Sequence, residues 1–236
     1  MGNPYKKYNY VGIDETSLGI GKNSIIVVAA TTYNASLITK TENYEINKSK
    51  DILVAAKAYN RNNKQLTYEN LPEFKSLEYM KSQGLNNFYW TRARGGRFPI
   101  QLIEHLSIAH VVNTNGFDSK KTVLFIDAFH GNHDDSQYII WESLKSDGFK
   151  IPREQINIIP NGDRTIPLIN YADLLAFQIG LSMNERYREY HPERIKIDVE
   201  PHRIEYDSQR TFKPMATEAR DNLEKIVKKM KSTSKN

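Results

Sequence analysis

Two apolar stretches of this sequence end in acidic residues, and these acids are the groups best suited to chemistry. The first stretch ends at Asp14 and Glu15, and the second ends at Asp127. A half-buried carboxylate at the end of a strand costs free energy unless a partner compensates its charge. Two such strands indicate that the carboxylates meet and that a cation holds them.

A later segment adds two more acids. Asp163 comes just before a predicted helix, and Asp173 lies within that helix. At helical spacing Asp173 falls in a stripe of apolar side chains, formed by Ile166, Ile169, Ala176 and Phe177. An acid in such a stripe requires a partner. The partner is either an arginine, for which Arg164 is the candidate, or a divalent metal ion shared with the other acids.

The chemistry of these acids favours hard metal ions. Several carboxylates without histidine or cysteine are typical of Mg²⁺ or Mn²⁺ sites. Two such ions close together would activate a water molecule and stabilise the leaving oxygen in phosphoryl transfer. In a regular strand Asp14 and Glu15 point to opposite faces, so both reach one site only if the strand ends or bulges there.

The elements that must position these acids follow from the pattern of apolar residues. Strands are predicted at residues 8–15, 24–32, 36–44, 121–127 and 156–159. Helices are predicted at residues 49–59, 99–112, 137–144 and 167–184, with a final helix from about residue 217. We expect a single domain over residues 1–236, with an insertion at 60–97 and a C-terminal helical extension at 185–236. This order predicts an α/β or mixed-sheet fold.

The acidic motifs resemble those of type 2 ribonuclease H. The run from Gly12 to Glu15, followed by Gly19, resembles the opening Gly-Ile-Asp-Glu motif of that family. The strand ending at Asp127 resembles its second acid-bearing strand, and the segment beginning at Gly162 resembles its later Lys-Gly-Asp motif. The resemblance implies a ribonuclease-H-like mixed β-sheet flanked by helices. It also implies metal binding by Asp14, Glu15, Asp127 and Asp163, with cleavage that leaves a 3′-hydroxyl and a 5′-phosphate.

The sequence departs from that family at three places. Asp173 stands where the family has a serine, and the helix around it is similar to other ribonuclease-H-like nucleases and integrase-like proteins, whose last acid comes from a helix. The family's Gly-Arg-Gly turn has no arginine here, because residues 17–19 are Ser-Leu-Gly. Phe177 replaces the lysine that follows the late helix motif. Junction-specific cleavage therefore does not follow, and RNA, RNA–DNA hybrid and structured DNA all remain candidate substrates.

The charge balance is consistent with a nucleic-acid substrate. The net charge is +5, and setting aside the five candidate acids leaves 33 basic against 23 acidic residues. A basic surface around an acidic site suits a polyanion. One segment combines aromatic residues with Arg92, Arg94 and Arg97, so it is either a nucleic-acid-binding loop or a connector with incidental charge. Arg164 is a fourth candidate for phosphate contact.

A second motif competes with this interpretation. Residues 130–134, His-Gly-Asn-His-Asp, resemble a fragment of the calcineurin-like metallophosphoesterases, but the flanking motifs of that family are missing. The alternatives are a polar loop in which Asp134 or Asp135 caps the next helix, and a role of His130 or His133 in proton transfer near the metals.

Several function classes are excluded or left open by composition. The absence of cysteine excludes disulfides and thiolate chemistry, and no apolar run is long enough to span a membrane. The N-terminus lacks a signal-peptide core, so we expect a cytoplasmic protein. The expected function is a metal-dependent endonuclease. The alternatives are a non-catalytic nucleic-acid-binding protein of the same fold and a mobile-element or defence component that acts with a partner.

Overall fold

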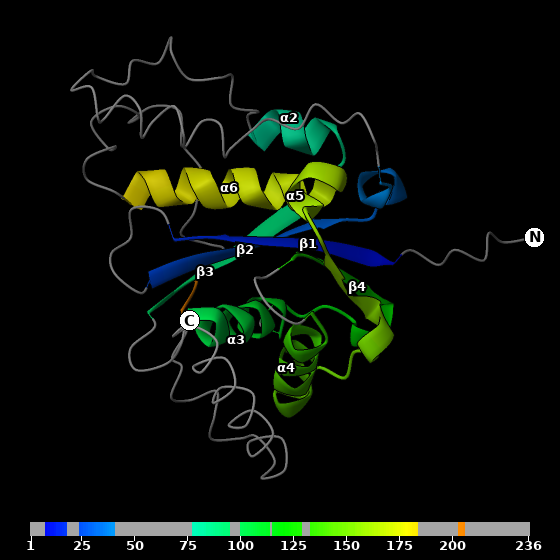
Figure 1. Ribbon diagram of the computed structural model, residues 1–236. Coiled ribbons are helices and arrows are strands. Elements are labelled where there is room, and N and C mark those ends of the chain that lie inside the picture. The colour runs from blue at the N-terminus through cyan, green and yellow to red at the C-terminus, as the bar shows by residue number, and fades with distance from the viewer. Residues whose placement is uncertain are drawn as a thin grey trace, which may run out of the picture.

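A mixed β-sheet forms the centre of the protein (Figure 1). The computed structural model describes residues 8–17, 24–40, 77–94, 100–113, 115–128, 133–183 and 203–205. Within these ranges the sheet has the order β5-β4-β1-β2-β3-β6. Its strands are β1 (Asn9–Thr16), β2 (Ser24–Thr32), β3 (Asn87–Arg94), β4 (Thr122–Asp127), β5 (Ile156–Ile159) and β6 (Arg203–Glu205).

The strand directions are those of an antiparallel meander extended by parallel crossovers. Strand β2 runs antiparallel to both β1 and β3, whereas β4 is parallel to β1 and to β5. The helices are α2 (Leu77–Ser82), α3 (Ile100–Asn113), α4 (His133–Ser146), α5 (Gly162–Thr165) and α6 (Pro167–Met183). Figure 1 shows α2, α5 and α6 on one side of the sheet and α3 and α4 on the other. The predicted α/β fold, a mixed sheet flanked by helices, is confirmed.

Side chains alternate along the strands and so build a separate core on each face of the sheet. On the face covered by α3 and α4, called the α3 face, Val11 and Ile13 of β1 pack with Leu124 and Ile126 of β4. On the opposite face, the α6 face, Tyr10 and Phe125 lie against a second core that includes most of the buried residues of α6. Within one strand, residues that are two positions apart point to the same face, and we say that they share a parity. The parity of a strand residue therefore tells which face its side chain occupies.

One glycine allows α6 to approach the sheet closely. A Cβ atom at Gly12 would lie 2.6 Å from both the carbonyl carbon and the carbonyl oxygen of Leu168. These are backbone atoms and cannot move aside, so only glycine permits this spacing between β1 and α6. The contact fixes the distance between α6 and the strand that carries the acid pair.

The third strand of the meander differs from the prediction. A strand at 36–44 is wrong for the residues described, because Ala35–Ile38 form a 3₁₀ turn, η1. The Asn34 side chain accepts a hydrogen bond from the Ser36 backbone N–H and caps that turn. The pairing partner of β2 is instead β3, which lies inside the stretch 60–97. Residues 41–44 and the predicted helix at 49–59 lie outside the described residues.

The later elements agree closely with their predicted ranges. The helix predicted at 99–112 is α3, and the one predicted at 167–184 is α6. Strands β4 and β5 match the predicted 121–127 and 156–159, while α4 begins four residues earlier than the predicted 137–144. The predicted final helix from about residue 217 lies outside the described residues. In the part of the chain that the structure describes, no helix combines the length and apolar character needed to cross a membrane.

Candidate metal centre

The acids of β1 and β4 lie side by side because these two strands are parallel neighbours. Ile13 pairs with Ile126 across the two strands, so the residues that follow them, Asp14 and Asp127, lie at the same edge of the sheet. Both have the parity of the α6 face, which Phe125 also occupies. Parallel strands whose C-terminal ends meet at one edge thus bring two carboxylates from distant sequence positions together.

Asp14 is a buried acid surrounded by other acids. Its side chain is 5% exposed, and its pKa is raised well above the ordinary value of 3.8. Burial is the largest cause, followed by the charges of Asp173, Glu15 and Asp127. A hydrogen bond of 2.7 Å from the Glu15 backbone N–H to Asp14 Oδ1 lowers the pKa and opposes this shift only in part. Among the described residues, every charged group that moves the pKa of Asp14 is therefore an acid.

Asp127 is held by the backbone of the turn that leads into α5. The Gly162 N–H donates a hydrogen bond of 2.6 Å to Asp127 Oδ1. A Cβ atom at Gly162 would lie 3.2 Å from that oxygen and 2.5 Å from Ile169 Cδ1. Asn161, with a left-handed φ of 52°, turns the chain so that this N–H points at the carboxylate. The turn therefore orients one oxygen of Asp127.

Glu15 points to the opposite face of the sheet from Asp14. Strand β1 neither ends nor bulges at the acid pair, since Glu15 pairs with Val27 and Thr16 with Ile26 in regular antiparallel register. Glu15 accordingly has the α3-face parity of Val11 and Ile13. No bulge turns Glu15 toward the face of Asp14. Acids therefore lie on both faces of the sheet near the end of β1.

Glu104 of α3 is an acid at this site that the sequence reasoning missed. It is 8% exposed, and its pKa is raised well above the ordinary value of 4.5. Burial is the largest cause, and the charge of Glu15, a hydrogen bond between the two side chains and the charge of Asp127 add to it. The sequence contained a sign of this acid, because Glu104 is surrounded by apolar residues of the same predicted helix, namely Leu102, Ile103 and Leu106. Asp173 was recognised by the same kind of apolar surroundings.

The two late acids are placed differently. Asp173 is half-buried on α6, and its charge is the largest one acting on Asp14. Asp163 is buried on α5, next to the glycine that binds Asp127. Asp163 is not among the charges that shift the pKa of Asp14 or of Glu104. The electrostatic interactions therefore group Asp14, Glu15, Asp127 and Asp173 with Glu104, while Asp163 lies in the turn whose glycine binds Asp127.

The donor chemistry of this group fits a hard divalent cation. The five side chains offer only carboxyl oxygens, the ligands that Mg²⁺ and Mn²⁺ take in proteins. In the described ranges, no three histidine or acidic side chains are arranged as the ligand shell of one ion. The described carboxylates are thus electrostatic neighbours that do not form a closed ligand shell.

The candidate nucleic-acid-binding residues are only partly described. Arg92 is half-buried on β3, and its parity is that of Phe88 and Trp90 on the α6 face. Arg164 is exposed on α5. Arg94 ends β3 and its side chain is not described, and Arg97 lies outside the described residues.

The aromatic residues near these arginines are not free to stack on bases. Trp90 is 2% exposed in the α6-face core, and Tyr89 packs edge-on against Phe117 with ring centroids 5.6 Å apart. The segment around them is a strand, so neither a binding loop nor a flexible connector describes residues 87–94.

The competing histidine motif leads directly into a helix. His133 is the first residue of α4, and Asp134 and Asp135 lie in its first turn. Neither aspartate therefore occupies the N-cap position that was predicted for one of them. In the first turn their charges interact favourably with the helix dipole. His130 lies outside the described residues.

The raised pKa values predict that the metal-free protein loses stability as the pH rises. An acid with a raised pKa binds its proton more tightly in the folded than in the unfolded chain. Its stabilising contribution is complete below the unfolded values, near 3.8 for Asp14 and 4.5 for Glu104, and is lost as the pH passes the raised values. Urea denaturation in EDTA between pH 4.5 and 8 measures this loss.

The control for this prediction is the same titration of Asp14→Asn. The pKa of Asp147 is also raised by burial, but its contribution is common to both proteins and cancels in their difference. The stability of wild type should fall relative to the variant across this pH range. Parallel curves for the two proteins would contradict the prediction.

The comparison with known proteins gives structural similarity without sequence similarity. No protein-family model matches the sequence, and no curated protein sequence matches it. The chain is similar to the ribonuclease H2 structure from Pyrococcus horikoshii OT3, with 13% identity, a TM-score of 0.48 and 78% of each chain covered. It is similar to ribonuclease HII in the PCNA complex from Archaeoglobus fulgidus, with 11% identity, a TM-score of 0.46 and 78% of each chain covered. A structure of Bst-RNase HIII in complex with Mn²⁺ is 14% identical, with a TM-score of 0.41, and covers 94% of this chain and 66% of that one.

These similarities concern the fold alone. The sheet of this chain is a mixed sheet with helices on both faces, as expected from the sequence. At 11–14% identity the solved structures carry no information about the reaction of this chain. Function must be argued from the site.

Proposed function

We propose that this protein is a metal-dependent nuclease that hydrolyses phosphodiesters in RNA, RNA–DNA hybrid or structured DNA. The observation that carries this proposal is the environment of Asp14, which is buried and on which, among the described residues, only acidic side chains act as charges. Such a group is costly to the folded chain and is compensated when cations bind. The expected ions are Mg²⁺ or Mn²⁺.

The residues have distinct roles in this proposal. Asp14 and Asp127 share the ions between them, because they lie next to each other at the sheet edge. Glu15 and either Asp173 or Asp163 complete the ligand set. Two divalent ions, when bound, supply a water molecule activated for attack and stabilisation of the leaving oxygen. The hydrogen bond from the Gly162 N–H would fix the orientation of the Asp127 carboxylate at the site.

The basic residues are assigned to the substrate. Arg92 pairs with Ile26, which pairs with Thr16, so Arg92 lies at the same end of the sheet as the acids. It has the parity of the α6 face, as Asp14 has, and is separated from β1 by one intervening strand. A guanidinium group at this position would contact a phosphate of a strand bound over the acids. Arg94, Arg97 and Arg164 are proposed to extend this contact.

A cleavage assay tests the proposal directly. The full chain is incubated with labelled RNA–DNA hybrid, duplex DNA, and single-stranded RNA and DNA, each with Mg²⁺, Mn²⁺ or EDTA. We expect cleavage of at least one substrate with a metal, and none in EDTA or with Asp14→Asn. Tight binding that is independent of metal, without cleavage of any substrate, would refute the nuclease and favour the non-catalytic binding protein.

A further inference from the structure

Glu104 is the acid that lacks a role in the site as predicted from the sequence. It lies on α3, a helix whose residues from Leu102 to Ala109 are all buried. Its carboxyl group makes a hydrogen bond with the carboxyl group of Glu15. The charges acting on it are those of Glu15 and Asp127, both acidic. A glutamate in this position is unfavourable for the fold by itself, since an apolar residue would fill the same space.

The acids divide between the two faces of the sheet. Asp14 and Asp127 have the parity of the α6 face, where α6 carries Asp173. Glu15 has the parity of the α3 face, where it meets Glu104. Asp173 acts on the pKa of Asp14 and is not among the groups that act on Glu104, which agrees with α3 and α6 lying on opposite sides of the sheet (Figure 1).

Asp127 and Glu15 connect the two groups, because the charge of each acts on both Asp14 and Glu104. The α3-face pair therefore lies close enough to the other acids to belong to the same centre. Two separate pairs, Asp14 with Asp173 and Glu15 with Glu104, then flank the end of β1.

We propose that Glu104 is a ligand of the metal centre and that it holds, together with Glu15, one of the two divalent ions on the α3 face. The other ion is held on the α6 face by Asp14 and Asp173, with Asp127 between the two positions. This inference rests on the proposed nuclease function and assigns the acids of that site to two separate ion positions. It explains why the buried face of α3 carries an acid next to Glu15.

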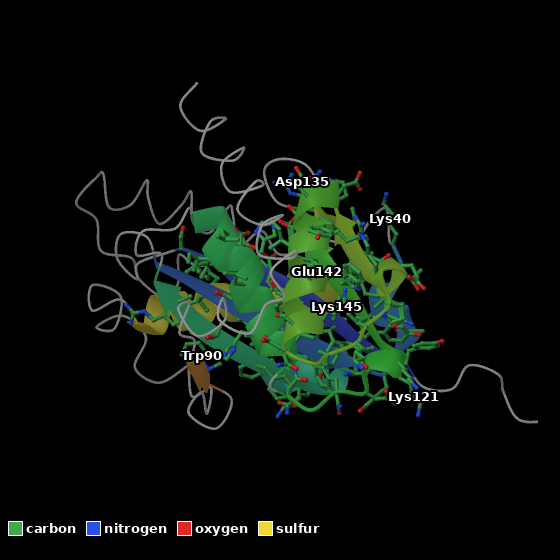
Figure 2. The ribbon with its side chains drawn as sticks, turned by 90° about the horizontal axis from the view of Figure 1, so that it is seen from below. Lys40, Trp90, Lys121, Asp135, Glu142 and Lys145 are labelled. Carbon is green, nitrogen blue, oxygen red and sulfur yellow. The ribbon has the colours of Figure 1, made fainter. Side chains whose placement is uncertain are left out.

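The chain provides a matched control for Glu104. Glu142 of α4 is also a helical glutamate and is also 8% exposed. Its Oε1 lies 3.4 Å from Lys145 Nζ, so its charge has a basic partner on the same helix. Figure 2 labels Glu142 and Lys145 on α4. Glu142 is not among the charges that act on Asp14 or Glu104, so Glu142→Gln tests the loss of a buried glutamate outside the site.

The experiment counts Mn²⁺ ions bound to the full chain, by electron paramagnetic resonance of free Mn²⁺ and by calorimetry. We expect two ions for wild type and Glu142→Gln. We expect Glu104→Gln and Glu15→Gln each to lose one ion, or to bind it at least tenfold more weakly. The double variant should lose no more than either single variant, because both glutamates serve the same ion. Glu104→Asp should restore part of the lost affinity.

The outcomes separate this inference from the proposed function. If wild type binds two ions and cleaves, and Glu104→Gln binds both ions with unchanged affinity, the role of Glu104 is refuted while the nuclease stands. If wild type binds no Mn²⁺, both are refuted. Circular dichroism in EDTA verifies that each variant folds. If Glu104→Gln fails to fold, Glu15→Gln tests the same ion, because Glu15 is only half-buried.

Discussion

Asp14→Asn is expected to abolish metal-dependent cleavage and, at the same time, to stabilise the metal-free protein. Asp14 is the most buried acid of β1 and lies beside Asp127, Asp173 and Glu15. Its loss removes a ligand at the centre of the proposed metal site, so cleavage should fall by at least about a thousandfold, equivalent to roughly 4 kcal/mol of transition-state stabilisation. Turnover of the best substrate at saturating Mn²⁺ measures this effect.

The stabilisation follows from the raised pKa of the same residue. Near neutral pH the folded chain must either ionise Asp14 among acids or keep it protonated, and both options cost free energy. Asparagine has nearly the same shape without the charge. Each unit of pKa displacement corresponds to about 1.4 kcal/mol, so the free energy of unfolding in EDTA should rise by about 1 kcal/mol or more. Urea denaturation at pH 7.5 measures the change.

The control for this variant is Asp118→Asn. Asp118 is an exposed aspartate that caps the 3₁₀ turn η3 (Ser119–Lys121) and lies 3.4 Å from Lys121 Nζ. The Asp118→Asn variant should cleave as wild type does, and its free energy of unfolding in EDTA should not rise. A variant at Asp14 that keeps its cleavage, or that is less stable than wild type in EDTA, would show that this acid does not bear an uncompensated charge in a metal site.

Asp173→Asn is expected to reduce cleavage by about a hundredfold, whereas Asp163→Asn should reduce it by less than about tenfold. The charge of Asp173 is the largest one acting on Asp14, and Asp163 is not among the charges acting on it. The resemblance to type 2 ribonuclease H assigns the metal-binding role to Asp163 instead. The electrostatics of this structure favour the helical acid.

Stability separates the two aspartates independently of activity. Removing the Asp173 charge relieves Asp14, so Asp173→Asn should raise the melting temperature in EDTA and reduce the gain that Mn²⁺ produces. Asp163→Asn should leave the gain from Mn²⁺ unchanged. The reverse order, with Asp163 controlling both cleavage and the response to Mn²⁺, would refute the assignment to Asp173. Thermal denaturation with and without Mn²⁺ provides the measurement.

The elements that carry the acids were largely predictable because their patterns are local. Strand β5 matches its predicted range, and β4 and α6 differ from theirs by one residue each at a single end. These segments have a strong period of apolar residues and clear turn residues at their ends. The misplaced third strand had no such pattern, because the polar turn at Asn34 and the pairing of β3 with β2 depend on contacts between distant segments.

The sequence by itself determined the α/β class, the acid-tipped strands and the carboxylate-only chemistry, because these depend on residue types and on periodicity along one segment. Tertiary structure decided which acids meet. Parallel pairing placed Asp127 beside Asp14, and regular pairing of β1 turned Glu15 to the other face. It also brought Glu104 of α3 to Glu15, and set Asp173 rather than Asp163 against Asp14. Burial and repulsion between charges arise from three-dimensional neighbours, and no single segment of sequence contains them.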